Sequence, residues 1–519
     1  MRREARADES LVARAHAAAR ARIARGRSFA ALHWAAWNLP NAIFVTRPRA
    51  WAALLALALA GCITQAGEQK LGDEEAKKVE QQMGLLREPA LEGYVRAVGE
   101  KLAAVCERPE GPWQFEVVDE HQPNAFALPG GHVYVTRGLL GLLNSEDELA
   151  GVLGHEIAHV TARHSVKRMG AEVLTAPVTI AAGIASSALG IVSPLLGSVV
   201  AGTGQVITGG LVLAPYSREQ EHEADELGQS LAARAGYDPA GLARFLRTLD
   251  RDLGLLKGEP RTFHFLDSHP LTPDRVARTE ERARELTRAP ASPVASGRGA
   301  FLARLEGIVV GEDPARGVFE DRRFLHPELD FAIDFPAGWQ TQNTNEAVGA
   351  VSPKKDAVVA LRMAATDSSL EKVLAEAAAE QSDVSFERIQ VGGLRAARAS
   401  LSGRGQVAEI TLIEHGRNVY GVVGQSAESV AKEYARALRA TADSFRPLRA
   451  SERGSIRESR LRVRAARAGE TPAQIAKRTG SSWDAEHVAV ANEVAVGDRF
   501  DAGWAVKLAL PQAYAPSGR

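Results

Sequence analysis

The segment from Asn144 to Val160 constrains the fold of this chain more than any other. Ser145 is followed three residues later by Glu148, which is the spacing of a helix capping box, and acidic residues fill the first predicted turn. Apolar residues then recur at helical spacing, at Leu149, Val152, Leu153, Ile157 and Val160. The sequence therefore predicts a helix that begins near Ser145 and carries His155 and His159 in its interior.

His155, Glu156 and His159 form a pattern with a specific chemical use. Two histidines four residues apart lie on one face of a helix, so both rings can reach one zinc ion at about 2.0–2.1 Å. Glu156 sits beside the first ring, where its carboxylate can take a proton from a water whose pKa the metal lowers toward ~7. A chance match on a surface helix is the rarer alternative. We predict a zinc site with two histidine ligands and Glu156 as the catalytic base.

A catalytic zinc site needs a third protein ligand, and His164 is the nearest candidate. In the metzincin pattern a glycine stands three residues after the second histidine, and a third histidine stands six residues after it. This chain has Ala162 and Ser165 at those positions, and His164 falls one residue short. We therefore reject His164 as the third ligand.

A second predicted helix offers carboxylates instead. Ser217 and Gln220 have capping-box spacing, and the helix is expected to run to about Gly236. Glu221 and Asp225 lie one turn apart on it. Glu221 can bind zinc while Asp225 accepts the free ring N–H of a ligand histidine, which fixes the tautomer of that ring.

Spacing alone does not choose the zinc ligand on this helix. Its other acidic residues compete with Glu221, namely Glu219, Glu223 and Glu226. Glu219 and Glu226 fit a solvated helix face, whereas Glu223 stays open as an alternative ligand.

Three stretches together resemble the zinc metallopeptidases of peptidase family forty-eight, which include CAAX-prenyl-protease, HtpX, Oma and BepA types. They are 124–131 with 133–140, 154–159, and 217–225. In that family the glutamate three residues before the Ala-Asp pair binds the metal, which implies Glu221 rather than Glu223. The resemblance covers about residues 70–285. It implies one zinc ion per chain, endopeptidase activity, and a mainly helical gluzincin domain with a small sheet, of the soluble periplasmic branch.

The resemblance also implies roles for residues around the metal ligands. His269 matches a histidine that can occupy the fourth zinc position and silence the enzyme, or stabilise the transition state; a histidine that merely precedes a helix is the simpler alternative. Asn124, Ala125 and Phe126 resemble the family's edge strand, to which a peptide substrate could pair by β-augmentation. Asn124 could instead serve only to form a turn.

The N-terminal part of the chain resembles a targeting region. Arg47 and Arg49 precede the apolar run 51–60, which is too short to span a bilayer. Residues 59–62, Leu-Ala-Gly-Cys, resemble a bacterial lipobox, although an Ala/Leu-rich segment can also produce these letters by chance. We predict a lipoprotein signal peptide over 45–61, lipidation at Cys62, and a mis-annotated or disordered extension over 1–44. The protein would then be lipid-anchored on the periplasmic side of the bacterial envelope, with the outer membrane favoured.

Residues 173–217 contain no charged side chain and are rich in Gly, Ala, Ser and Thr. The interspersed prolines and glycines leave no clean run of ~20 strongly apolar residues. Three interpretations stay open: a lid or membrane-apposed loop near the site, buried core helices, or membrane insertion.

The chain is expected to be α+β and to contain several domains, since 519 residues exceed one ordinary domain. The metalloprotease domain is predicted over 62–288, followed by a linker over 289–314. An α/β accessory domain, similar to PsbP/Mog-type domains, is predicted over 315–447, with strands at 330–335, 358–361 and 419–423 and helices at 370–380 and 430–445. A second linker is predicted over 448–460. Residues 461–514 resemble a small βααβ LysM-like module, a type that binds peptidoglycan; such a unit without glycan binding is the alternative.

The charge distribution bears on the partners. Residues 1–61 carry a net +7, which leaves −8 on the rest of a chain of net charge −1. An acidic body argues against nucleic acid as a partner. We expect protein substrates, a membrane contact through the lipid anchor, and peptidoglycan through the LysM-like module. The predicted function is endopeptidase quality control of envelope proteins, and the alternative is a latent protease that acts as a chaperone or assembly scaffold.

Overall fold

The computed structural model describes residues 65–167, 215–255, 264–272, 274–290, 293–345, 347–380, 384–403 and 405–516. The chain divides into two compact units, Met1–Gly61 and Cys62–Arg519, and the fold below belongs to the second. The predicted extension over 1–44, the signal peptide over 45–61, Cys62 and nearly all of 173–217 lie outside the described residues. What the sequence indicates for those segments stays a prediction.

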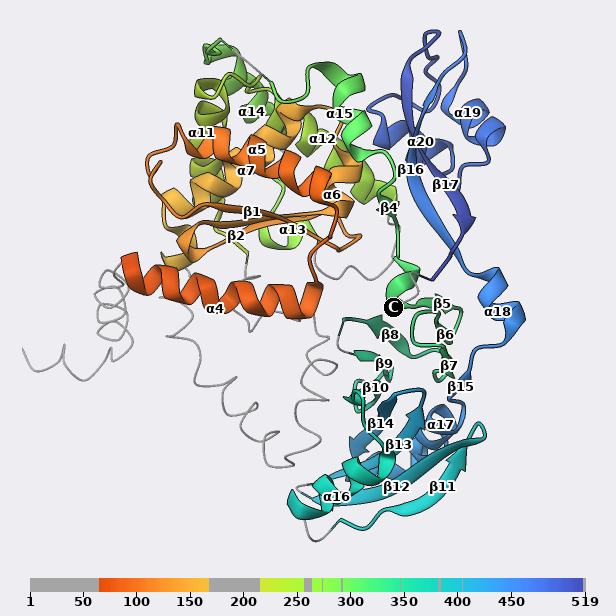
Figure 1. The fold of residues 1–519 in the computed structure, drawn as a ribbon. Coiled ribbons are helices and arrows are strands. Elements are labelled where there is room, and N and C mark those ends of the chain that lie inside the picture. Colours follow the sequence, from red (N-terminus) through yellow and green to blue (C-terminus); the bar gives the residue numbers. More distant parts are fainter. Residues whose placement is uncertain are drawn as a thin grey trace, which may run out of the picture. The chain divides into compact units, whose positions relative to one another are not determined.

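Helix α7 (Glu146–Thr161) forms as predicted and lies among other helices of the N-terminal domain (Figure 1). Leu149, Val152, Leu153 and Ile157 on its apolar side are fully buried, and each such burial stabilises the fold by roughly 1.5–3 kcal/mol. The helices that pack against it are α5 (Pro89–Ala103), α11 (Arg218–Arg234) and α12 (Gly241–Leu255). Further helices of this domain are α4 (Gln65–Met83), α6 (Arg137–Leu142), α13 (Phe265–Ser268) and α14 (Arg275–Glu285).

A small sheet lies beside these helices in the order β1-β3-β2. Its strands are β1 (Gln114–Val118), β2 (Ala125–Leu128) and β3 (His132–Thr136), and β3 is parallel to β1 and antiparallel to β2. The 3₁₀ turn η1 (Pro129–Gly131) joins β2 to β3; Gly130 and Gly131 adopt φ values of 84° and 100° there, which favour glycine. Strand β2 is an edge strand of this sheet, as expected.

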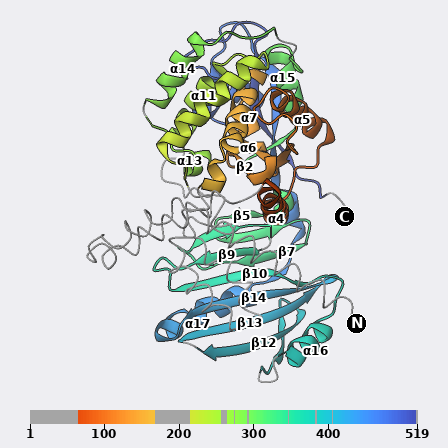
Figure 2. The same ribbon diagram turned by 90° about the vertical axis from the view of Figure 1, so that its left-hand side faces the viewer.

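The accessory domain contains a seven-stranded antiparallel sheet in the order β11-β12-β13-β14-β10-β9-β8 (Figure 2). One face packs against α17 (Ala431–Asp443) and the other against α16 (Leu370–Glu380), and each face forms its own apolar cluster. The strands are β8 (Gln340–Asn343), β9 (Ala347–Val351), β10 (Ala357–Ala365), β11 (Glu387–Val391), β12 (Leu394–Gly403), β13 (Gln406–His415) and β14 (Asn418–Ala427).

A four-stranded sheet, in the order β15-β7-β6-β5, completes this domain. Its strands are β5 (Val318–Glu320), β6 (Arg323–His326), β7 (Phe331–Asp334) and β15 (Arg446–Pro447), and the 3₁₀ turn η2 (Pro314–Arg316) contacts β6. A second 3₁₀ turn, η3 (Glu428–Val430), joins β14 to α17. The helices and strands predicted from 330–335, 358–361, 370–380, 419–423 and 430–445 all form.

The C-terminal module has the predicted β-α-α-β order. It consists of β16 (Arg457–Ala465), α19 (Pro472–Thr479), α20 (Ala485–Ala491) and β17 (Ala505–Ala513). Strand β16 also pairs with β4 (Val309–Val310), so segments on either side of the accessory domain share one sheet. Leu461 of β16 belongs to the same buried cluster as α7 and α12. The module is therefore packed against the N-terminal helical domain rather than tethered to it.

Both predicted linkers differ from the structure. Helix α15 (Gly297–Leu305) occupies much of 289–314, because Phe301, Leu302 and Leu305 form an apolar stripe that is fully buried. The Pro, Ser and Gly residues of 289–299 are typical of a flexible linker, which is why the sequence predicted a linker here rather than a helix. Helix α18 (Ala450–Ser455) forms within 448–460, where Glu452 bonds back to the backbone N–H of Arg449 and pairs with Arg446.

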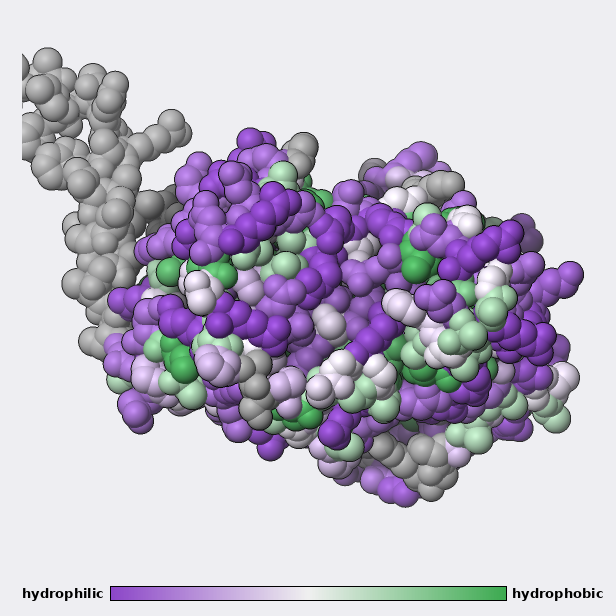
Figure 3. Space-filling view, turned by 90° about the horizontal axis from the view of Figure 1, so that it is seen from above, coloured by the Kyte–Doolittle hydropathy of each residue, from purple (hydrophilic) through white to green (hydrophobic). Residues whose placement is uncertain are grey.

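Few large apolar side chains of the described residues reach the surface. The face in Figure 3 is mostly hydrophilic, with hydrophobic residues in small separate groups. The exposed large apolar residues are Val105, Val294, Val496 and Trp504. Within the described ranges, no helix combines the length and the apolar character that crossing a bilayer requires.

Candidate metal centre

Helix α7 begins with the cap that its sequence predicts. Ser145 Oγ accepts a hydrogen bond from the backbone N–H of Glu148. The Glu148 carboxylate accepts from the backbone N–H of Asn144 and from Ser145 Oγ, so the cap extends one residue further back than expected. This start places His155, Glu156 and His159 in the helix interior, where all three side chains are fully buried.

Helix α11 carries the carboxylates and begins with a complete capping box between Ser217 and Gln220. It crosses α7 at two glycines. A Cβ on Gly154 would lie 2.9 Å from the carbonyl oxygen of Gly228, and a Cβ on Gly228 would lie 2.7 Å from the backbone nitrogen of His155. Since neither position has room for a side chain, the two backbones approach closely enough for Glu221 to face the histidines.

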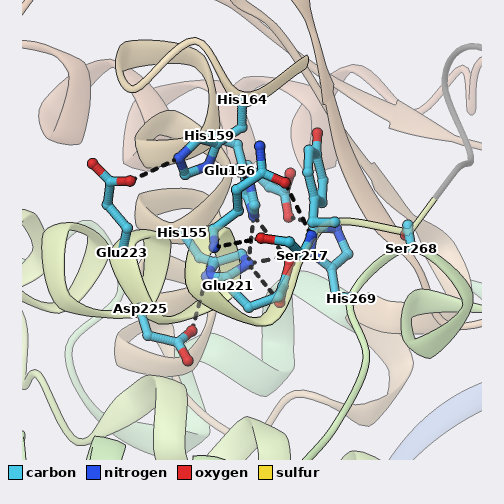
Figure 4. Close-up of polar contacts among 12 residues, drawn as sticks. His155, Glu156, His159, His164, Ser217, Glu221, Glu223, Asp225, Ser268 and His269 are labelled. Atoms are coloured by element: carbon cyan, nitrogen blue, oxygen red, sulfur yellow. Dashed lines mark hydrogen bonds and ion pairs between the residues drawn. The ribbon is translucent and has the colours of Figure 1, made fainter. Parts of the chain in front are cut away.

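The predicted ligands converge on one point (Figure 4). One donor atom each from His155, His159, Glu221 and His269 lies within 4.8 Å of the others. The Nε2 atoms of His155 and His159 are 3.0 Å apart, and Glu221 Oε1 lies 3.4 Å from His159 Nε2. His269 Nδ1 lies 2.9 Å from Glu221 Oε1 and 3.2 Å from His155 Nε2. The structure thus brings the three predicted ligands and the predicted regulatory histidine together.

The donor set fits a zinc ion. His155 Nδ1 lies 3.0 Å from Asp225 Oδ1, and His159 Nδ1 lies 3.0 Å from His164 Nδ1. Since each ring uses its Nδ1 elsewhere, both Nε2 lone pairs are available and point at the same place. Two imidazole nitrogens and one carboxylate are a common protein ligand set of catalytic zinc.

Glu156 lies beside this cluster without belonging to it. Its carboxylate is fully buried, and one oxygen lies 3.5 Å from Nε2 of His269. Burial raises the pKa of Glu156, although electrostatic interactions with His269 and His155 oppose that rise. A buried carboxylate with a raised pKa is suited to exchanging a proton at neutral pH.

Arg275 is a site residue that the sequence analysis did not single out. Its guanidinium donates from Nε and Nη2 to the two oxygens of Asp225, at 2.7 and 2.8 Å, and its Nη1 lies 2.6 Å from Glu221 Oε2. Burial alone would raise the pKa of Asp225, but Arg275 and His155 hold it below its usual value. The available signal was indirect: a carboxylate zinc ligand and a second carboxylate one turn away place two negative charges close together, and such a pair needs a cation when it is buried.

Among the other predicted residues, Asp225 contacts His155 as expected. Asn124 directly precedes strand β2, and Ala125 and Phe126 begin it. All three side chains are buried, and Phe126 stacks on Tyr134 in a cluster with residues of α4. Residues 124–128 are at most 3% exposed, main chain included, so the pairing of a peptide with β2 stays a prediction.

A His-Glu-x-x-His helix that faces a glutamate from a second helix defines a metallopeptidase domain of the gluzincin type. Residues 89–283 match the sequence profile of peptidase family M48, and this part of the chain is an M48 peptidase domain.

Two curated relatives share this region. The chain is 33% identical over 241 residues to a putative beta-barrel assembly-enhancing protease of Vibrio cholerae, covering 46% of this chain and 49% of the relative. It is 32% identical over 192 residues to the mitochondrial metalloendopeptidase OMA1 of Schizosaccharomyces pombe, covering 36% of this chain and 52% of the relative. The chain thus spans about half the length of the curated relatives it matches.

The matches to solved structures are weak. The solution structure of cyanobacterial PsbP from Synechocystis matches 27% of this chain and 98% of its own, at 11% identity and a TM-score of 0.20. The PsbP/Mog-type accessory domain and the LysM-like module stay predictions.

Proposed function

We propose that the chain is a zinc-dependent endopeptidase in which His155, His159 and Glu221 hold the metal and Glu156 is the catalytic base. The observation that carries the proposal is the convergence of two Nε2 lone pairs and one carboxylate beside a buried Glu156. The M48 match over the same residues supports it.

Zinc bound there would polarise a peptide carbonyl and make a water more acidic. Side chains of the protein would transfer the proton and hold the ligands in position. Glu156 accepts the proton of the attacking water on a carboxylate oxygen and returns it to the leaving amine nitrogen. Asp225, fixed by Arg275, holds the ring of His155. A peptide that pairs with the edge strand β2 would bind through its main chain, which permits broad sequence tolerance because main-chain hydrogen bonds do not depend on side chains.

His269 supports a second candidate, a latent protease that acts as a chaperone or assembly scaffold. Its Nδ1 points into the ligand cluster, where it would fill the position that a water or substrate needs. The main proposal requires this ring to leave during turnover, whereas the alternative keeps it in place.

The relative named for beta-barrel assembly suggests envelope proteins as substrates, and quality control as the role. With the predicted lipidation at Cys62, the protease would act on the periplasmic side of a bacterial envelope, bound to the outer membrane rather than the inner. The C-terminal module would add contact with peptidoglycan.

The substitution Glu156→Gln tests the main proposal. It should retain the fold and one zinc ion per chain, and lower the cleavage of unfolded casein by about 10²-fold or more. Chelation should abolish wild-type cleavage, and added zinc should restore it. Substantial cleavage by Glu156→Gln would contradict the assigned base. Casein cleavage by His269→Ala, compared with wild type, separates the alternatives: a rise indicates latency, and no cleavage in either protein favours the scaffold.

A further inference from the structure

The two candidate histidine ligands have different outer partners. Nδ1 of His155 lies against Asp225, a carboxylate buried beside Arg275. Nδ1 of His159 lies 3.0 Å from Nδ1 of His164, another ring. His164 Nε2 in turn lies 3.1 Å from Oε2 of Glu223, whose side chain is 53% exposed (Figure 4).

These contacts permit a single consistent arrangement of hydrogens when the metal is bound. A ligand His159 offers the lone pair of Nε2 to the metal, so its proton is on Nδ1. That Nδ1–H can donate only if His164 Nδ1 is an acceptor. The proton of neutral His164 is then on Nε2, where it donates to Glu223. Each donor in the chain meets one acceptor, and the chain ends on a carboxylate.

We propose that His164 and Glu223 are positioning residues that fix the tautomer and the ring plane of His159 as a zinc ligand. The inference rests on the proposed function, because it assumes a metal on His159. It assigns a role to His164 and Glu223, which the sequence analysis considered as possible zinc ligands. Outer partners of this kind orient a ligand ring and raise its basicity, and their loss typically costs 10–100-fold in metal affinity.

Packing alone is the competing explanation for His164. Its ring is fully buried and meets the His159 ring edge-on, with centroids 5.0 Å apart. Phenylalanine would keep that aromatic contact but accept no hydrogen bond. Asparagine would lose the ring contact but place Oδ1 where Nδ1 was. The two substitutions therefore separate the hydrogen bond from the packing.

We call the chain of contacts from His159 through His164 to Glu223 the relay. The zinc affinity of the full chain tests it, measured by competition with a chromogenic chelator at one fixed pH. We expect His164→Phe to bind zinc 10–100-fold more weakly than wild type, and His164→Asn to recover most of that loss. Glu223→Ala should weaken binding several-fold, whereas Glu219→Gln, an exposed carboxylate of the same helix, should bind as wild type does. Cobalt in place of zinc should show an altered visible spectrum in His164→Phe and a wild-type spectrum in Glu219→Gln.

Equal zinc affinity in wild type, His164→Phe and Glu223→Ala would overturn the relay, and so would a larger loss in His164→Asn than in His164→Phe. If His164→Phe does not fold, the surface variant Glu223→Ala decides by the same readout. A wild-type chain that binds no zinc would overturn the proposed function as well. A wild-type chain that binds zinc and cleaves casein, with unaffected variants, would overturn the relay alone.

Discussion

Arg275 donates two nearly parallel hydrogen bonds to Asp225, and both side chains are buried between helices α14 and α11. The same guanidinium reaches Glu221, so one cation balances a candidate ligand and the carboxylate that holds another ligand. A buried charge cluster of this kind depends on all its members, because each one removed leaves an uncompensated partner.

Arg275→Met should therefore lower the free energy of unfolding by about 3–5 kcal/mol, since it leaves two buried carboxylates without a cation. Zinc affinity should fall with it, because Asp225 and Glu221 lose their orientation. Urea unfolding and bound-zinc content measure the two effects. Arg278→Met is the matched control on the same helix: Arg278 is 48% exposed and lies 3.8 Å from Glu226, so we expect a change of at most ~1 kcal/mol. Equal unfolding midpoints for the two variants would refute this role of Arg275.

Gly228→Ala should separate α11 from α7, because the new methyl group would meet the backbone nitrogen of His155. We expect a loss of about 1–3 kcal/mol in stability and weaker zinc binding, since Glu221 moves with α11. Gly93→Ala in α5 is the control, because nothing lies within 4 Å of the Cβ it would add. That variant should be stabilised by up to ~1 kcal/mol. Unchanged zinc affinity in Gly228→Ala would mean that the crossing does not set the ligand geometry.

Lys507 in β17 is fully buried, and its ammonium donates to the carbonyls of Gly141, Leu142 and Leu143 at 2.9, 3.0 and 2.7 Å. Lys507→Met would leave these carbonyls without that donor, at a cost of about 1–3 kcal/mol or more. The lost contact lies at the end of α6, just before the cap of α7, so the midpoint of thermal unfolding of the catalytic domain should fall. Lys477→Met, at an exposed position of the same module, should leave that midpoint unchanged. Identical melting of both variants would contradict the role.

His326 should make stability depend on pH. Burial lowers its pKa to about 4, and its Nδ1 accepts a hydrogen bond from the backbone of Leu329. An unfolded histidine titrates near 6.5, so between pH 6.5 and 4 the unfolded chain binds more protons and stability falls as the pH falls. We expect this residue to contribute on the order of 2 kcal/mol to that loss.

His326→Asn checks this dependence, because asparagine keeps an acceptor for Leu329 but does not titrate. The difference in unfolding free energy between wild type and variant, measured in urea at several pH values, should shrink as the pH falls from 6.5 to 4. A difference that stays constant across this range would rule out the contribution of His326.

The metal cluster was predictable where local spacing or a familiar motif carried the information. The i, i+4 spacing put His155 and His159 on one face, and the resemblance chose Glu221. Arg275 and the contact of His164 with Glu223 were not predictable, because they depend on the crossing of α7 with α11 and on the path of a segment much later in the chain. No local pattern reports which nitrogen of a histidine meets a neighbour.

The same distinction holds for the fold. Alternation and apolar runs gave the strands and helices of the accessory domain. The stripe of Phe301 and Leu305 was overlooked because flanking Pro, Ser and Gly dominate the composition there. The packing of β16 against the N-terminal helices could not be inferred from the sequence of β4 or of β16. Strand pairing over such a sequence separation depends on the complete tertiary fold.

The pairing of β4 with β16 has a consequence for the order of events during synthesis. The candidate metal ligands leave the ribosome early. Leu461, which is buried in the same cluster as α7, and Lys507, which bonds to the end of α6, follow only after the whole accessory domain. Domains that fold as separate units can mature one after another during translation. Here the core around the candidate metal ligands would stay incomplete until β16 and β17 are synthesised, so the metal site should reach its final geometry only after the accessory domain has been made.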